Sequence, residues 1–289
     1  MTCDVDAART FIYANGRLLE QRVFTALFED GAASAVVKAL AAYQNADGGF
    51  GHGLEPDKRA PASQPLDVEI AFERLVTVGA HAADLVISAC NWLETVASAS
   101  GAVPVLLPSV AGYPRAEHWQ PTEYTPGVNP TAGIAAHAHA LGVAHPWVDL
   151  ATEYCFVEIE SGRLPHEAHD LLGLCRLVGS APDRPRATRA AELIAAALPS
   201  ASFMKLDPES DAYGVTPLEF APSPTSLARS WFDDVLLEAH LDNFEREQLE
   251  DGGWPISWMP PSEASRCEWR AIRTIQALRV LSAYGRLQN

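Results

Sequence analysis

The densest group of polar side chains that could do chemistry lies between residues 52 and 64. Acids and bases alternate there, followed by a hydroxyl and an amide: His52, Glu55, Asp57, Lys58, Arg59, Ser63 and Gln64. A carboxyl group buried in an apolar setting keeps its proton at a higher pH than usual and can serve as a general acid. We therefore expect Glu55 and Asp57 to be catalytic, with His52 and Arg59 contacting the substrate. The structural alternative is that Asp57 and Ser63 cap turns or helices while Glu55 pairs with Arg59.

A second charged group, Glu268-Trp269-Arg270, lies inside an otherwise apolar helical stretch. An unpaired charge is costly to bury, so an inward-facing Glu268 and Arg270 need a partner or a ligand. One interpretation makes Glu268 catalytic and Arg270 substrate-binding. The other makes them a structural ion pair that closes the last helical hairpin onto the first.

His166 and His169 begin a helix and lie three residues apart, so both imidazoles share one helix face. Such a pair can hold a metal ion, but the spacing reveals no third ligand. The sequence therefore gives no metal site, and we expect His166 to contact the substrate. The cofactor is unknown, although Mg²⁺ is expected if the substrate is a diphosphate.

Tryptophan is frequent, with seven in the chain. Aromatic walls stabilise cationic intermediates through cation–π attraction, and they serve equally well as packing in a helical core. We expect Trp119, Trp254 and Trp269 to line the substrate site, with the packing interpretation open for each of them.

The elements that must position these side chains are helices. Apolar residues recur at helical spacing in ten segments, and no period-2 strand of useful length is present. The expected helices are 7–28, 33–43, 66–78, 83–96, 131–141, 147–159, 167–178, 187–198, 227–249 and 262–284. This pattern predicts an all-α protein.

Two of the loops between these helices share one pattern. Gln44-Asn45-Ala46-Asp47-Gly48-Gly49-Phe50 and Gln248-Leu249-Glu250-Asp251-Gly252-Gly253-Trp254 have the same Gln, Asp and Gly-Gly positions, followed by an aromatic residue. Three weaker loops, which begin at Gly101, Gly162 and Gly214, lie between them, and the five glycines are on average about 51 residues apart. Two helices and two short connections fill such an interval, so the spacing predicts stacked helical hairpins.

The Gln-x3-Gly-x-aromatic pattern resembles the QW motif of the prenyltransferase and squalene-cyclase superfamily of terpenoid cyclase-like proteins. The resemblance implies an α/α toroid of five to six hairpins, in one domain over residues 1–289, with the substrate in a central cavity. It carries a fold better than a reaction, because the chain has neither the D-x-D-D acid motif nor an identifiable set of prenyltransferase zinc ligands. In such a toroid, residues 101–130 would form a rim loop or lid.

The composition of the chain limits the classes of partner that it can bind. A net charge of −16 with scattered Lys and Arg disfavours nucleic acid and anionic lipid surfaces. The longest apolar runs, such as 132–143, are shorter than the ~20 residues of a membrane span. No secretory signal is visible, and the five cysteines follow no disulfide or metal spacing. We expect a cytoplasmic protein with reduced thiols that binds a small apolar substrate, with its oligomeric state open.

Three functions are compatible with these features. The first is a terpenoid cyclase-like or prenyltransferase-like enzyme that acts on an apolar, isoprenoid substrate in the toroid cavity. The second is a non-catalytic ligand-binding or scaffold toroid, whose polar junction residues serve stability. The third is a glycan-processing α/α toroid, which would use paired carboxylates and Trp platforms in an open polar cleft.

Overall fold

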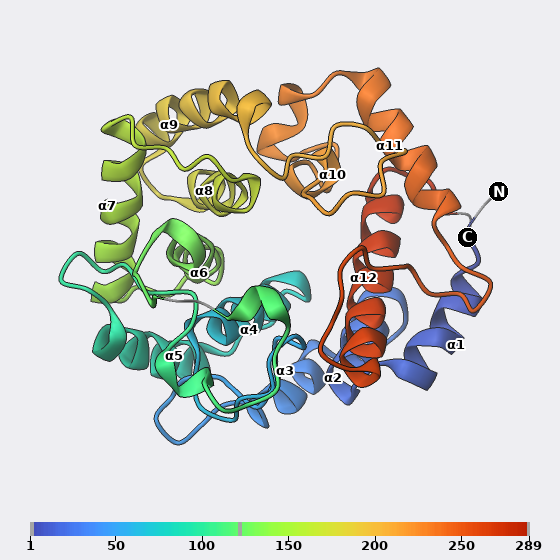
Figure 1. The fold of residues 1–289 in the computed structure, drawn as a ribbon, viewed down its shortest axis with the longest axis horizontal. Helices are drawn as coiled ribbons and strands as arrows, with labels where there is room; N and C mark the ends of the chain where they lie inside the picture. The colour runs from blue at the N-terminus through green and yellow to red at the C-terminus, as the bar shows by residue number, and fades with distance from the viewer. Residues whose placement is uncertain (1–2, 121–122, 288–289) are drawn as a thin grey trace. The chain divides into compact units, whose positions relative to one another are not determined.

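A computed structural model of the chain describes residues 3–120 and 123–287. Within these ranges the protein is all-helical, with 58% of its residues in helices and no β-strand. The chain forms two compact units, which Figure 1 colours by residue number. Unit 1 combines Met1–Ala32 with Phe203–Asn289, and unit 2 is the continuous segment Ala33–Ser202.

Unit 2 is built from helices packed in two layers. The helices α4, α6 and α8 are neighbours in one layer, and α5, α7 and α9 are neighbours in the other. Each hairpin joins the layers, because α4 packs on α5, α6 on α7 and α8 on α9. The bounds are α3 Ala33–Ala41, α4 Pro65–Thr77, α5 Ala83–Val96, α6 Val128–Ala140, α7 Pro146–Glu160, α8 Ala168–Ser180 and α9 Arg184–Ala197, with short 3-10 helices at Pro108–Val110, Glu117–Trp119 and Leu198–Ser200.

The centre of unit 2 is the contact between α6 and α8, the most extensive of its helix pairs. Every residue of α6 from Pro130 to Ala138 is buried, and most of them are small. A Cβ at Gly173 of α8 would lie 3.5 Å from the Cβ of Ala132 and 3.6 Å from the backbone nitrogen of Gly133. Small residues on both helices therefore let their backbones approach closely.

Unit 1 joins the two ends of the chain. The N-terminal hairpin of α1 (Val5–Asn15) and α2 (Leu18–Phe28) packs against the C-terminal helix α12 (Glu263–Ala283), and α12 packs against α11 (Asp234–Arg246). The short helix α10 (Pro217–Phe220) packs on α11, and a 3-10 helix, Leu227–Trp231, lies between them. The first hairpin and the last helix therefore pack against each other within this unit.

The sequence pattern located most helices but merged two pairs of elements. The predicted helix 7–28 is two helices, because the chain is extended at Gly16 and Arg17. A Cβ at Gly16 would lie 2.8 Å from the carbonyl oxygen of Ile12 and 3.2 Å from the Cβ of Ala271, so glycine permits this tight bend. The predicted helix 227–249 is a 3-10 turn followed by α11, with Asp233 capping the latter by accepting a hydrogen bond from the Leu236 N–H.

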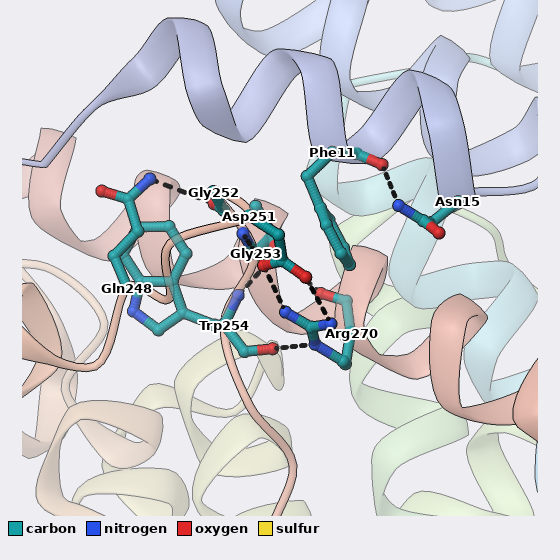
Figure 2. A network of polar contacts seen from close by, with 9 residues as sticks. Phe11, Asn15, Gln248, Asp251, Gly252, Gly253, Trp254 and Arg270 are labelled. Carbon is teal, nitrogen blue, oxygen red and sulfur yellow. Dashed lines mark hydrogen bonds and ion pairs between the residues drawn. The ribbon is translucent and has the colours of Figure 1, made fainter.

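The two loops that share the Gln-x-x-Asp-Gly-Gly pattern fold identically, one in each unit. In unit 2 the Gln44 side chain donates to the carbonyl oxygen of Gly48 (2.8 Å), and Asp47 accepts from the N–H of Gly49 (3.0 Å). In unit 1 Gln248 donates to Gly252 (3.0 Å), and Asp251 accepts from Gly253 (3.1 Å), as Figure 2 shows. The aromatic residues that follow, Phe50 and Trp254, are fully buried.

Each loop also contacts one helix that is not its neighbour in sequence, and both loops do so in the same register. Gln44 donates to the carbonyl oxygen of Leu85 in α5, and Gln248 donates to that of Asp4, the N-cap of α1. Three residues further along each helix, a Cβ on the left-handed glycine would strike the backbone: Gly48 against Ser88 at 2.5 Å, and Gly252 against Ala7 at 2.3 Å. The motif therefore positions one helix against the Gly-Gly loop.

A third loop keeps the turn without the side chains. Gly101 is left-handed (φ 87°), its N–H donates to Ser98, and the Ser98 N–H donates to Ala102, as in the two complete copies. Gly162 is left-handed but faces open space, and Gly214 is not left-handed. Three of the five expected loops thus share one backbone structure, and the other two do not.

Two further observations concern the chain as a whole. No helix of the described residues is long and apolar enough to cross a membrane. All five cysteines are free thiols, which agrees with the expectation of reduced cysteines.

Candidate functional site

The candidate site lies where the loop before α4 meets the start of that helix. Pro65 begins α4, and Asp67 lies in its first turn with no exposed surface. Oδ1 of Asp67 accepts a hydrogen bond from the Glu55 N–H (2.8 Å), and its Oδ2 lies 2.5 Å from Nζ of Lys58, which is also fully buried. Breaking such a buried pair would leave an uncompensated charge, which is costly. The Lys58–Asp67 pair therefore holds the loop against the start of α4.

Glu55 has a strongly perturbed pKa. Burial raises the pKa of Glu55 to about 8; Asp57 and Asp67 raise it too, while Lys58 and the Trp119 indole act in the opposite direction. The side chain is 3% exposed, and Oε2 is buried without a hydrogen bond to any described residue. At pH 7 Glu55 therefore carries its proton and can donate it.

A chain segment, Val103–Trp119, covers this site, and we call it the strap. It pairs with the loop at Lys58 and Arg115, where the Arg59 N–H donates to Pro114 (2.9 Å) and the Ala116 N–H donates to Asp57 (2.7 Å). It ends in the short helix that carries His118 and Trp119. The expectation of a lid in residues 101–130 thus corresponds to a defined segment, although residues 121–122 lie outside the described ranges.

His118 brings a second titratable group to the strap. Its Nε2 lies 3.6 Å from Oδ2 of Asp57, whose side chain is almost fully buried. Burial lowers the pKa of His118, so the imidazole favours its neutral form at neutral pH. Asp57 therefore faces His118 of the strap, and its side chain is shielded from solvent.

An apolar cluster lies beside these polar groups. Its buried members come from the loop, from α4 and from the strap, and they are Ala60, Leu66, Leu106 and Val110. The partly buried Trp119 and Tyr124 pack against this cluster. The protonated Glu55 thus borders an apolar surface through Trp119. The proton donor and the aromatic rings thus lie side by side, enclosed by the strap.

A second group of carboxyls lies in the α4–α6–α8 layer. Burial raises the pKa of Glu69 to about 7, against the opposing effect of Arg176 in α8. Its side chain is nevertheless only partly buried. Glu69 thus combines strong desolvation with partial exposure to solvent, and we call its surroundings on α4, α6 and α8 the recess.

The floor of this recess is glycine. A Cβ at Gly133 of α6 would lie 1.8 Å from Oε1 of Glu69, so only glycine leaves room for the carboxyl in this position. Asp170 of α8 lies near the same layer, where burial raises its pKa to about 6 and a hydrogen bond to Asn129 opposes the shift. Arg176 follows Asp170 by six residues, or ~9 Å along α8. Glu69 therefore has Arg176 as its cationic neighbour, whereas Asp170 interacts with Glu167 and Asn129 at the start of α8.

The other predicted residues of unit 2 have local roles. His52 is exposed, with a left-handed backbone (φ 58°), and its Nε2 lies 2.9 Å from Oδ1 of Asn45. Arg59 is partly buried beside the strap, and Lys58, not Arg59, is the cation that acts on Glu55. His166 is exposed, and its carbonyl oxygen accepts from Ser202. Ser63 stabilises the first Gly-Gly loop, where its hydroxyl donates to Asp47.

In unit 1, two predicted substrate-binding residues hold the second Gly-Gly loop together (Figure 2). Both outer nitrogens of Arg270 bind the carboxylate of Asp251 (2.7 and 2.9 Å), its Nε donates to the carbonyl oxygen of Trp254, and its guanidinium lies over the ring of Phe11. The Trp254 indole donates to the carbonyl oxygen of Phe244 (2.8 Å). Trp254 has no exposed surface and is a core residue.

Glu268 and Trp269 also belong to unit 1. Glu268 is paired with Arg17 at 3.8 Å and not with Arg270, so the expected Glu268–Arg270 ion pair is wrong. The reason is helical geometry, because residues two apart point to different faces of α12. Arg17 and Glu268 instead join the first hairpin to the last helix. Trp269 packs edge-on against Trp258, with ring centroids 5.2 Å apart.

Sequence reasoning missed Glu69, Asp170 and Arg176 because each lies in an amphipathic helix where a charged residue is ordinary. One signal was available. Gly133 and Gly173 lie inside helices, where glycine costs ~1 kcal/mol relative to alanine and usually has a packing or functional reason. No group of three or more His, Cys, Asp or Glu side chains among the described residues could hold a metal ion.

Comparisons with known proteins do not extend this picture. No model of a known protein family matches the chain, and no curated protein matches it.

Proposed function

We propose that this protein is an enzyme that begins its reaction by protonating an apolar substrate, with Glu55 as the general acid. The observation that carries the proposal is the neutral, almost fully buried Glu55 carboxyl, with a pKa of about 8 and no hydrogen bond on Oε2 to a described residue. The raised pKa keeps Glu55 in its acid form at pH 7, and transfer of this proton to an alkene would then depend on stabilisation of the resulting cation by the neighbouring aromatic rings. The QW-like loops favour an isoprenoid substrate and the α/α-toroid fold that goes with it.

The surroundings of Glu55 support the chemistry that would follow. The acid would give its proton to one carbon of a C=C bond, whose π electrons form the new C–H bond and leave a cation on the other carbon. Trp119 and Tyr124 offer aromatic faces to that cation, and Lys58 stabilises the carboxylate that remains. Loss of a proton from the product cation returns Glu55 to its starting state.

The test is Glu55→Gln, assayed with unsaturated polyprenyl compounds, both as hydrocarbons and as diphosphates with Mg²⁺. The amide keeps the shape of the side chain but has no acidic proton, so turnover should fall by ~10²-fold or more with little loss of thermal stability. Glu94→Gln on the exposed face of α5 is the matched control and should keep full activity. Wild-type activity should decline above about pH 8 as Glu55 ionises.

Two other results would change the conclusion. Full turnover by Glu55→Gln would remove Glu55 as the acid. If the wild type turns over none of these compounds and Glu55→Gln only alters stability, the non-catalytic ligand-binding or scaffold toroid becomes the better account.

The recess on α4, α6 and α8 favours a second candidate, a glycan-processing enzyme. Glu69 and Asp170 have pKa values raised to about 7 and 6, and Arg176 adds a polar donor, so this site suits a hydroxylated substrate. Acid and base roles on sugars need two carboxyls with different protonation. Here Glu69→Gln and Asp170→Asn should each abolish release of reducing ends from oligosaccharides while Glu55→Gln leaves it unchanged. The reverse pattern would favour the first candidate.

A further inference from the structure

The Glu55 carboxyl cannot meet a substrate in the observed conformation. It is 3% exposed, and the strap lies over it with Trp119 next to the acid and His118 against Asp57. The outer parts of the same segment are open to solvent, because Pro108, Ser109 and residues 111–114 are exposed. The strap is therefore a thin layer with solvent on one side and the buried acid on the other.

The attachment of the strap is local and separate from the main core. Gln64 makes two of its contacts, donating from Nε2 to Ser109 Oγ (2.8 Å) and accepting at Oε1 from the Leu107 N–H (2.7 Å). Its apolar contacts include the small cluster of Ala60, Leu66, Leu106 and Val110, and Val103 and Ala116 of the strap are also buried. The strap contains only two three-residue 3-10 helices, so it can detach without breaking a long helix.

The closed strap leaves polar atoms unsatisfied, which favours opening. Nε of Arg115 is buried without a hydrogen bond to a described residue, and the Trp119 indole lies against the Glu55 carboxyl and offsets only part of the cost of its burial. Each group regains water when the strap lifts, and this hydration offsets part of the lost apolar contact. Meanwhile the N-terminal end of the strap remains tied to α6, since the Val103 N–H donates to Thr131 Oγ1 (2.9 Å).

We propose that Val103–Trp119 is a lid that detaches from the loop and α4 as one segment, turning about its attachment at Val103, and so opens the way to Glu55. Its role as a gate for substrate rests on the proposed function of Glu55. Its ability to open on its own, while the rest of unit 2 stays folded, does not rest on that function and can be measured separately.

The experiment measures how fast a cysteine under the lid reacts with a thiol reagent. Ala60→Cys places a thiol in the cluster that the strap covers, and Ala135→Cys places one in α6; both alanines have no exposed surface. Each protein is treated with iodoacetamide, and mass spectrometry of the digested protein identifies the labelled site, so the five native cysteines stay in place. A local opening should label Cys at position 60 at least ~100-fold faster than at position 135.

Urea separates local from global opening. Labelling at position 60 should change little in low urea, whereas labelling at position 135 should accelerate in proportion to global unfolding. Adding Ser109→Ala, which removes a contact of the strap with Gln64, should speed labelling at position 60 several-fold and leave position 135 unchanged. Equal rates with the same urea dependence at both positions would overturn the lid.

A measurement without the cysteine substitutions guards against disturbed folding. In the wild type, hydrogen exchange at the Arg59 and Ala116 amides, which bind the strap to the loop, should be much faster than exchange at amides inside α6. Exchange at the same rate in both places would also contradict the lid. Neither readout uses turnover, so a failure of the lid is distinguishable from full activity in Glu55→Gln, which would instead contradict the proposed acid.

Discussion

Three acids of unit 2 show how strongly position governs a side chain's chemistry. Glu55 is closed off beneath the strap, whereas Glu69 and Asp170 lie in a recess that solvent still reaches. Burial raises the pKa of all three, to about 8, 7 and 6. The fully enclosed acid has the highest value, as expected when desolvation dominates the shift. Sequence alone shows the residue types, but the protonation states depend on enclosure by segments distant in sequence.

Glycine placement in the recess gives a prediction at the residue scale. Gly133→Ala should be less stable than Gly173→Ala by up to ~1 kcal/mol, because its Cβ would overlap Oε1 of Glu69 at 1.8 Å and force that side chain into another rotamer. Gly173→Ala is the matched control in the facing helix, where the new Cβ would make ordinary contacts at 3.5 and 3.6 Å. It should be neutral or stabilising by up to ~1 kcal/mol.

Urea unfolding of the two variants measures the difference. The double variant Gly133→Ala with Glu69→Ala should recover part of the loss, since the clash disappears with the carboxylate. Equal stabilities for the two glycine variants would mean that Glu69 does not occupy the space above Gly133.

At the scale of elements, the Gly-Gly loop shows what a short motif can predict. Its repetition indicated two equivalent loops, and both copies have the same hydrogen bonds and contact α5 and α1, respectively, in the same register. The pattern could not show that Asp251 would take Arg270 as its partner while Asp47 takes Ser63, because those residues follow each loop at different distances. The prediction was wrong for the Gly162 and Gly214 loops because glycine alone does not specify the turn.

The same limit applies to what the sequence could predict of the candidate site. The cluster at residues 52–64 was visible as a run of polar residues, and Glu55 and Asp57 are indeed buried together. The key partners Asp67 and Trp119 come from α4 and from the strap, and no periodicity predicts that packing. Helix boundaries were predictable where apolar spacing was unbroken, and they failed at Gly16 and Phe232, where local backbone geometry interrupts the pattern.

The Gly-Gly loop yields a prediction at the element scale. Gly48→Ala should destabilise unit 2 by ~3 kcal/mol or more, because a left-handed backbone (φ 94°) is combined with a Cβ 2.5 Å from the Ser88 carbonyl oxygen. Gly112→Ala in the strap isolates the first factor: its φ is 89°, and nothing lies within 4 Å of the new Cβ. That variant should lose only ~1 to 2 kcal/mol.

Thermal unfolding of both variants by circular dichroism provides the measurement. A similar loss in each would show that backbone strain alone accounts for the glycine at position 48. The interpretation that the close approach of Gly48 to Ser88 positions α5 against the loop would then lose its support.

At the scale of the whole molecule, the two units each contain one complete Gly-Gly loop and one apolar core. Unit 2 holds Glu55, the strap and the recess, and unit 1 holds the junction of the chain ends. The single closed toroid over residues 1–289 concerns how the units meet, and it stays a prediction. The same is true of a site shared by residues 52–59 and 254–270.

The raised pKa values make a prediction for the whole molecule, because they link its stability to pH. An unfolded glutamate loses its proton near pH 4.5, whereas folded Glu55 keeps it until about pH 8. Between these values the folded state binds the extra proton, so its free energy of unfolding must fall as pH rises. Glu69 adds to this slope up to about pH 7 and Asp170 up to about pH 6. Between pH 7 and 8 Glu55 is therefore the main contributor of the three, at on the order of 1 kcal/mol per pH unit.

Glu55→Gln should remove that last part of the slope, since an amide does not titrate. Urea unfolding of the wild type and this variant at pH 5, 6, 7 and 8 measures it, with Glu94→Gln as the exposed control. The two glutamine variants should differ in slope most clearly between pH 7 and 8, where Glu94→Gln should follow the wild type. If the wild type and Glu55→Gln lose stability in parallel over this interval, Glu55 is ionised in the folded protein and cannot be the acid of the proposed reaction.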